Sequence, residues 1–230
     1  MLHPAEGPRS SRDKQAVVRD LAWFDRAYQA RLGKRYRTFR AAFALLLERT
    51  GANRAIVETG CVREKNDYSA GYSTVLFGEF LERGGGRLFT VDLSPQNMAL
   101  CRRITRRYQR WISYHVGDSI AFLAAWAMTQ PRVEIDLLYL DSFDYELEPN
   151  RDAAREASQR HCLGELEAAL PSLARHALVL IDDGDLPGGG KPRLAKRRLA
   201  ELGWTCVLDD YQTLWSAPSA SGASIPSSSS

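Results

Sequence analysis

The sequence predicts a doubly wound α/β domain, built on a mostly parallel seven-stranded sheet with helices on both faces. Apolar runs alternate with amphipathic stretches along the chain, an order typical of parallel sheets with helical crossovers. Only Asp209–Gln212 separates the last two runs, which is too short for a crossover, so we expect the last strand to pair antiparallel. The expected strands are Ala55–Thr59, Arg87–Val91, Ile112–Val116, Ile135–Leu140, Ala177–Ile181, Trp204–Leu208 and Thr213–Ser216.

Composition limits the class of protein. The 230 residues fit one domain, and 44% hydrophobic with 26% charged residues is a globular balance that excludes wholesale disorder. The longest apolar stretch, Ala41–Leu47, is too short to cross a bilayer, and the first residues lack the apolar core of a secretory signal. We therefore expect a cytoplasmic protein with no membrane partner. Its four scattered cysteines are expected to be reduced thiols.

Three segments are expected along the chain. Asp13–Leu32 and Tyr36–Thr50 have helical patterns, and the second is followed by Gly51, a typical residue just past a helix end. Residues 1–50 are therefore interpreted as an N-terminal helical cap and residues 51–216 as the sheet domain. Residues 217–230 are almost all Ser, Ala, Pro and Gly, a composition that predicts a disordered tail.

A cluster of arginines is the main feature of a mildly basic chain, whose net charge is +3. Such a cluster can bind an acidic partner such as nucleic acid. Arg103, Arg106, Arg107 and Arg110 recur at helical spacing, however, and the favoured interpretation is a solvated outer helix face.

A cofactor cradle is predicted where the first strand ends. Glu58 and Gly60 close a buried run, and after an intervening segment Gly71 and Ser73 open the next helix. Glycine allows the backbone to approach a ligand closely, and the free amides of a helix start favour a carboxylate. Glycine is also common in strand-to-helix turns for steric reasons alone. The residues at the end of the next strand are therefore needed to distinguish a cofactor site from an ordinary turn.

The second and third strands end in residues suited to a nucleoside. Asp92, followed by Leu93, lies 21 residues beyond Gly71, where an acid can accept both hydroxyls of a ribose. The alternative is that Asp92 caps the helix that begins near Ser94. Asp118 and Ser119 end the third strand and are candidates for the adenine edge, although Asp118 could equally be a helix N-cap.

Carboxylates also follow the fourth and fifth strands. Asp141 comes directly after one buried run, and Asp182 and Asp183 follow the next. Three such groups at neighbouring strand ends would repel one another unless a cation or protons intervened, so we predict that they bind one divalent cation, Mg²⁺. The alternative is that Asp183 or Asp185 only begins a turn before Gly188–Gly190.

These motifs resemble those of class I S-adenosylmethionine-dependent methyltransferases, and in particular catechol O-methyltransferase-like enzymes. The resemblance covers about Ile56–Trp215. The segments ETGCVREKNDYSAGYST, LYLDSFDYE, RHCLGEL and YQTLW are more closely similar to bacterial methyltransferases associated with surface polysaccharides or natural products. The resemblance implies a Rossmann-like fold, S-adenosylmethionine as cofactor and magnesium. The residues that carry it are Glu58, Gly60, Gly71, Tyr72, Ser73, Asp92, Gly117, Ser119, Asp141, Asp182 and Asp183.

The sequence departs from the catechol enzymes in two places. Cys61–Ala70 is an insertion, and Asp144 stands where the resemblance leads us to expect a catalytic lysine. Both departures weaken the case for catechol as the substrate. The candidate catalytic bases are Asp144 and His161, since both are expected to face the transferred methyl group.

The predicted activity is methyl transfer to a hydroxyl of a sugar or secondary metabolite. Amine methylation and RNA methylation are the alternatives among methyltransferases. A nicotinamide oxidoreductase would need a compact Gly-x-Gly-x-x-Gly turn, which the first strand lacks. A non-catalytic nucleoside-binding module is the remaining alternative. The expected partner is a small-molecule or glycan acceptor rather than nucleic acid, and a homodimer is left open.

Overall fold

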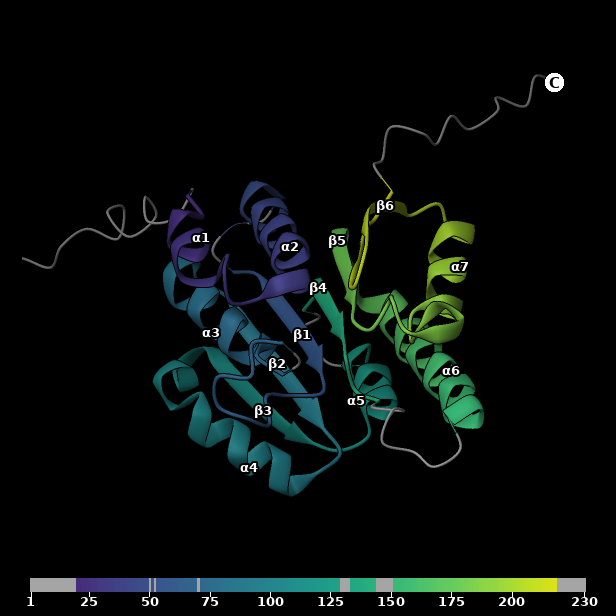
Figure 1. Cartoon of the computed structure of the whole chain (residues 1–230), viewed down its shortest axis with the longest axis horizontal. Helices are drawn as coiled ribbons and strands as arrows, with labels where there is room; N and C mark the ends of the chain where they lie inside the picture. The colour runs from purple at the N-terminus through teal and green to yellow at the C-terminus, as the bar shows by residue number, and fades with distance from the viewer. Residues whose placement is uncertain are drawn as a thin grey trace, which may run out of the picture.

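The computed structural model describes residues 20–49, 51, 53–69, 71–128, 133–143 and 151–218, and its centre is a seven-stranded sheet. The strand order is β3-β2-β1-β4-β5-β7-β6 (Figure 1). The first five strands pair parallel, whereas β7 pairs antiparallel with both β5 and β6. The strands are β1 (Ala55–Thr59), β2 (Arg87–Asp92), β3 (Ile112–Val116), β4 (Ile135–Leu140), β5 (Leu173–Ile181), β6 (Thr205–Asp209) and β7 (Thr213–Ser216).

The predicted fold class is confirmed, including the antiparallel last strand. The largest difference is at β5, which begins at Leu173 rather than Ala177. Its first residues include the exposed pair Arg175 and His176, so the apolar pattern that marks a buried strand begins only at Ala177.

Helices cover both faces of the sheet. Successive side chains of a strand point to opposite faces, so Leu137 and Tyr139 of β4 join one core while Leu138 and Leu140 join the other. The first core is covered by α1 (Ala22–Tyr28), α2 (Tyr36–Arg49), α3 (Ser73–Gly84) and α4 (Pro95–Ile104). The second core is covered by α5 (Ser119–Trp126), α6 (Arg151–Ala169) and α7 (Arg193–Glu201).

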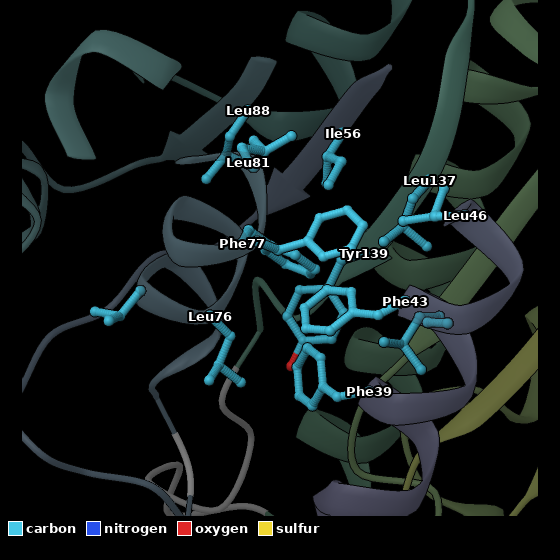
Figure 2. Close-up of a cluster of buried hydrophobic side chains, with 14 of the residues drawn as sticks. Phe39, Phe43, Leu46, Ile56, Leu76, Phe77, Leu81, Leu88, Leu137 and Tyr139 are labelled. Atoms are coloured by element: carbon cyan, nitrogen blue, oxygen red, sulfur yellow. The ribbon is translucent and has the colours of Figure 1, made fainter. Parts of the chain in front are cut away.

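Aromatic rings join the N-terminal helices to the sheet. Phe39 and Phe43 of α2 pack against Phe77 of α3, with ring centroids 5.7 and 6.0 Å apart. The ring centroid of Phe77 also lies 5.5 Å from that of Tyr139, a residue of β4 (Figure 2). All four rings are fully buried, so the cap helices share one core with the sheet.

Parts of the predicted terminal segments lie outside the described residues. The predicted helix Asp13–Leu32 is represented by α1, and residues 1–19 are outside the described part; Tyr36–Thr50 is represented by α2. Residues 219–230 of the predicted tail are also outside it. In the described part, no helix is long and apolar enough to cross a membrane.

The arginine cluster lies on the surface, as the favoured interpretation predicted. The residues do not share one continuous α-helix, because α4 ends at Ile104 and a 3-10 helix, Arg106–Trp111, follows. Two of them have neighbours on the surface: Arg110 lies over the ring of Trp111, and Arg107 lies 2.8 Å from Glu82. All are exposed.

The shared aromatic core predicts a large loss of stability when Phe77 is shortened. Phe77→Ala removes a fully buried ring and should lower the free energy of unfolding by about 3–5 kcal/mol. Met128→Ala is the control, because that side chain is 81% exposed and its loss should change stability by less than about 0.5 kcal/mol. Urea unfolding followed by circular dichroism measures both, and equal midpoints for the two variants would contradict the packing described.

Candidate active site

A cavity of about 570 Å³ opens at the carboxyl ends of β1, β2, β3 and β4. Ligands of open α/β sheets bind at this edge, and the volume is within the range of small-molecule sites. The strand-end loops supply most of the wall, and α4 and α6 supply the rest. The lining residues are Gly60, Cys61, Arg63, Gly71, Val91, Asp92, Leu93, Ser94, Gln96, Asn97, Gly117, Asp118, Ser119, Asp141, Ser142, Phe143 and His161.

Gly60 allows the β1 turn to lie directly against β4. Its φ is +82°, and a Cβ at this position would collide with the Asp141 carbonyl oxygen. Only glycine satisfies both constraints. The backbone of Gly60 is fixed from the other side, since its N–H donates to the Val91 carbonyl at 2.8 Å. The predicted close approach of backbone at Gly60 is therefore present.

Glu58 and Ser73, two of the residues predicted to bind the cofactor, do not line the cavity. Glu58 is fully buried, accepting hydrogen bonds from Ser73 Oγ at 2.6 Å and Thr74 Oγ1 at 2.8 Å. Thr74 Oγ1 in turn accepts from the backbone N–H of Val62 at 2.9 Å. Together these bonds connect the end of β1, the following loop and the first turn of α3. Burial raises the pKa of the Glu58 carboxyl to about 7.

Asp92 lies in the cavity wall at the end of β2. Its Oδ1 accepts a hydrogen bond from the Ser94 backbone N–H at 2.8 Å, and Asn97 Nδ2 lies 3.3 Å from the same oxygen. The helix-cap alternative for Asp92 is wrong, because the N-cap of α4 is Ser94. The carboxylate is thus held in place by its own loop while it lines the cavity beside Leu93.

Asp118 and Ser119 lie just beyond β3, where α5 begins, and also line the cavity. The N-cap alternative for Asp118 is confirmed, since its Oδ1 accepts from the Ala121 N–H at 2.8 Å. Ser119 Oγ lies 3.1 Å from His161 Nε2, which links the β3 loop to α6.

His161 reaches the cavity from α6, with a carboxylate behind it. Glu165 Oε1 lies 3.3 Å from His161 Nε2 and accepts a hydrogen bond from Ser142 Oγ at 2.7 Å. The hydrogen bond to Glu165 raises the pKa of His161 above its usual 6.5, against the effect of burial. The other candidate base, Asp144, lies outside the described residues.

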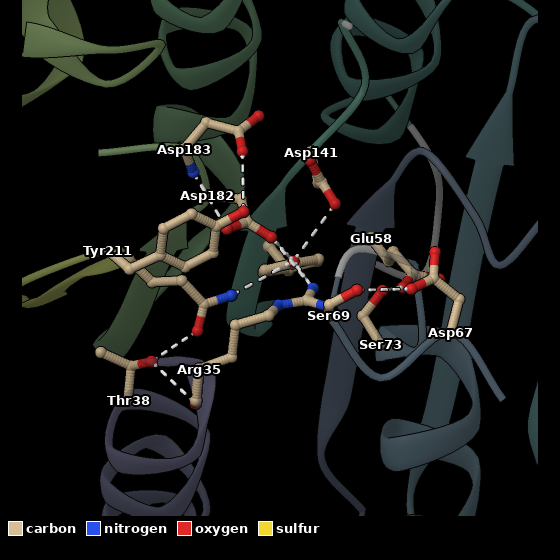
Figure 3. A network of polar contacts seen from close by, with 12 residues as sticks. Arg35, Thr38, Glu58, Asp67, Ser69, Ser73, Asp141, Asp182, Asp183 and Tyr211 are labelled. Atoms are coloured by element: carbon tan, nitrogen blue, oxygen red, sulfur yellow. Dashed lines mark hydrogen bonds and ion pairs between the residues drawn. The ribbon is translucent and has the colours of Figure 1, made fainter. Parts of the chain in front are cut away.

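The three aspartates predicted to bind metal meet in one network with two cations, Arg35 and Lys191, that the sequence analysis did not place there. Figure 3 shows the aspartates with Arg35. Lys191 Nζ lies 2.8 Å from Asp141 Oδ1 and 3.0 Å from Asp183 Oδ2. Arg35 Nη2 lies 2.9 Å from Asp182 Oδ2. Burial lowers the pKa of Lys191, but the neighbouring carboxylates more than offset this and hold it above its usual value.

The arrangement does not fit the predicted magnesium site. All six carboxylate oxygens have protein partners: Asp182 Oδ2 also accepts from Tyr139, and its Oδ1 from the Asp183 N–H. Asp183 Oδ1 accepts from Tyr211 at 3.1 Å, and Asp141 Oδ2 lies 3.3 Å from Tyr139 Oη. Across the residues that the structure describes, no group of three or more His, Cys, Asp or Glu side chains could hold a metal ion. The premise that these carboxylates lack a counter-charge is corrected, because Arg35 and Lys191 supply it.

Sequence reasoning missed four residues of this region: Arg35, Tyr139, Glu165 and Lys191. Arg35 was not recognised because Asp182 is 147 positions away in the chain. Lys191 was not recognised because it reaches Asp141 and Asp183 only through the folded loop that precedes it, and Tyr139 was treated only as part of an apolar run. Glu165 follows His161 by one helical turn, a spacing at which side chains meet, so this pair could have been found.

Comparison with known proteins identifies the family. A family model for a methyltransferase domain matches residues 68–184, slightly more than half of the chain. The chain belongs to this methyltransferase family. The predicted enzyme class, a class I S-adenosylmethionine-dependent methyltransferase, is confirmed. No curated protein sequence matches the chain significantly.

Solved structures of methyltransferases have the same fold. An O-methyltransferase from Bacillus cereus, in complex with S-adenosylhomocysteine, is 15% identical with a TM-score of 0.54, covering 84% of this chain and 95% of that one. The TDP-rhamnose 3′-O-methyltransferase CalS11 of calicheamicin biosynthesis is 17% identical with a TM-score of 0.54, covering 91% and 88%. TomG from Streptomyces achromogenes, an O-methyltransferase of tomaymycin synthesis in complex with S-adenosylmethionine, is 16% identical with a TM-score of 0.50, covering 85% and 95%.

Burial of Glu58 predicts a specific dependence of stability on pH. The pKa of the folded state, about 7, is above the ordinary 4.5, so the folded protein binds the proton more tightly. The free energy of unfolding should therefore fall by about 3 kcal/mol as the pH rises from 4.5 to above 7, at about 1.36 kcal/mol per pKa unit.

The Glu58→Gln variant should lack this component. Chemical unfolding at several pH values between 4.5 and 8 measures the difference between the two proteins. A difference that does not change with pH would mean that Glu58 titrates normally.

Proposed function

We propose that this methyltransferase transfers the methyl group of S-adenosylmethionine to a hydroxyl oxygen of a sugar or secondary metabolite. The observation that carries the proposal is one cavity lined both by Asp92, which suits an adenosine ribose, and by His161, which suits removal of a hydroxyl proton. Seven of the nine residues predicted to bind the donor line this cavity: Gly60, Gly71, Asp92, Leu93, Asp118, Ser119 and Asp141.

The donor half of the proposal follows from the strand-end loops. Asp92 would accept hydrogen bonds from both ribose hydroxyls, with its orientation kept by the Ser94 amide. Leu93, which is 74% exposed, offers an apolar surface for the adenine. Glu58 and Ser73 would act indirectly, by fixing the first turn of α3 next to the loop that carries Gly71.

For the acceptor, the protein has to supply only a position next to the donor and a base for the hydroxyl proton. The sulfonium is already activated, so positioning of donor and acceptor supplies most of the rate enhancement. The carbon–sulfur bond breaks as the carbon–oxygen bond forms, and the hydroxyl proton passes to His161. A carboxylate can only accept, so His161 Nε2–H donates towards Glu165 and Nδ1 is left as the basic atom.

The kind of acceptor is proposed from the cavity and the fold. The exposed arginines near α4 do not line the cavity, which favours a small molecule or glycan over nucleic acid. Another protein of this fold, CalS11, is a TDP-rhamnose 3′-O-methyltransferase, which supports a sugar hydroxyl as acceptor. A cytoplasmic location and a homodimer stay predictions. No step of the proposed reaction uses a divalent cation.

Asp92→Ala should weaken binding of S-adenosylhomocysteine by about 1–3 kcal/mol, because the ribose hydroxyls lose a charged acceptor. Isothermal titration calorimetry measures the affinity. Asp209→Ala is the matched control, since Asp209 also ends a strand but pairs with Lys196 on the surface, away from the cavity. A folded Asp92→Ala protein with unchanged affinity would remove Asp92 from the donor site. Tight binding of NADH in place of S-adenosylhomocysteine would overturn the proposal.

His161→Ala should lower turnover by about 10²–10⁴-fold with little change in donor affinity. The neutral imidazole is the active form, so activity should fall as the pH drops through a pKa above 6.5. Glu165→Gln should shift this acid limb to lower pH, because it removes the main cause of the raised pKa.

Two measurements follow the role of His161. Turnover is assayed against a panel of nucleotide sugars, hydroxylated metabolites and amines, and the imidazole pKa is determined by NMR in both proteins. An identical His161 pKa in Glu165→Gln would contradict the pairing, and full turnover of His161→Ala would mean that another group is the base. Methylation of amines alone would replace the proposed hydroxyl acceptor.

A further inference from the structure

We propose that the ammonium group of Lys191 takes the place of a divalent cation between Asp141 and Asp183, so that methyl transfer by this enzyme is independent of metal ions. The inference rests on the proposed function in one respect, that Asp141 lines the cavity where the donor binds. It makes Lys191 a positioning residue that acts through Asp141.

The position of Lys191 is that of a bridging cation. Its Nζ lies between a carboxylate at the end of β4 and another at the end of β5, 2.8 and 3.0 Å away. The side chain is 1% exposed, so the ammonium has exchanged water for these two ligands. A buried ammonium needs such partners, and the two carboxylates need a positive charge.

The backbone conformation at Gly190 places Lys191 next to the aspartates. Gly190 has a φ of +61°, and a Cβ there would collide with the Asp183 carbonyl oxygen. Gln159 of α6 donates from Nε2 to the carbonyl of Gly190 at 3.0 Å, and the Lys191 N–H lies 3.3 Å from the Asp183 carbonyl. The peptide that joins Gly190 to Lys191 is thus held by hydrogen bonds at both its carbonyl and its N–H, and Lys191 enters the aspartate cluster as a permanent part of the fold.

The charge of the cluster also favours an ammonium. Burial raises the pKa of Asp141 well above its usual value, and the Lys191 ammonium opposes this by favouring the carboxylate. With all three carboxylates ionised, Arg35 and Lys191 leave one net negative charge, and Asp141 lies in the cavity wall. That charge attracts the donor's sulfonium and loses this attraction once the methyl group has left. A divalent cation in addition would make the cluster positive beside the sulfonium, and one in place of Lys191 would make it neutral.

The test measures cation binding apart from catalysis. Wild-type protein is titrated with MnCl₂, followed by electron paramagnetic resonance and by thermal unfolding, with and without S-adenosylhomocysteine. We expect no bound equivalent of Mn²⁺ and no change in turnover with EDTA. Lys191→Met keeps the aliphatic stem but frees two carboxylates, and should bind Mn²⁺ roughly tenfold more tightly than wild type, with a higher Tm in its presence.

Two further variants sharpen the result. Lys196→Met removes a lysine from the exposed pair with Asp209 and should bind Mn²⁺ no better than wild type. Lys191→Arg keeps the charge, and should likewise gain no Mn²⁺ affinity.

Several outcomes would overturn the inference. One is stoichiometric Mn²⁺ binding by wild type, or loss of its turnover in EDTA; another is a folded Lys191→Met protein without gained affinity. If Lys191→Met does not fold, the wild-type titration decides alone. Failure to bind S-adenosylhomocysteine would count against the proposed function and leave the cation result valid.

Discussion

The buried ion pair between Arg35 and Asp182 holds the N-terminal helices against the carboxyl edge of the sheet. The two side chains are 1% and 2% exposed, and the residues are 147 positions apart in the chain. Burying two charges is costly, and the cost is offset here by additional hydrogen bonds from Tyr139 and the Asp183 amide. Removing one partner of such a pair typically costs about 3–5 kcal/mol. The geometry of the aspartate cluster therefore depends on where α2 begins.

Tyr139 connects this ion pair to the apolar core. Its ring packs between Phe39 and Phe77 (Figure 2). Its hydroxyl accepts from Arg35 at 2.6 Å and donates to Asp182 at 2.6 Å. A tyrosine suits this position because its apolar ring packs in the core and its hydroxyl forms hydrogen bonds with the ion pair. The cluster at the sheet edge is thus anchored by side-chain packing as well as by charge, which restricts how far the Asp141 carboxylate can move relative to the cavity.

The sequence was sufficient for features set by local pattern. Strand positions follow from apolar periodicity, and the place of Asp92 at the end of β2, in the cavity wall, could be predicted because it directly follows a buried apolar run. The sequence was insufficient for features that depend on contacts formed only in the folded chain. Three aspartates at strand ends were interpreted as metal ligands, since the bend that returns Lys191 to them was not recognised. The run Gly188–Gly190 was a signal of that bend, because such glycines allow the backbone to approach β5 closely.

The register of the sheet determines which side chains surround Glu58. Glu58 is paired with Thr90 on one side and with Tyr139 on the other, so a row of buried polar side chains crosses the three central strands on the face that carries α2 and α3. Glu58, in the middle of this row, accepts from the hydroxyls of Ser73 and Thr74 and fixes the start of α3. One end of the row meets Arg35 and the aspartates through the Tyr139 hydroxyl. Because a shift of one residue would turn every member of the row to the opposite face, the register that buries the core also holds the start of α3 and the charged cluster in a fixed relation.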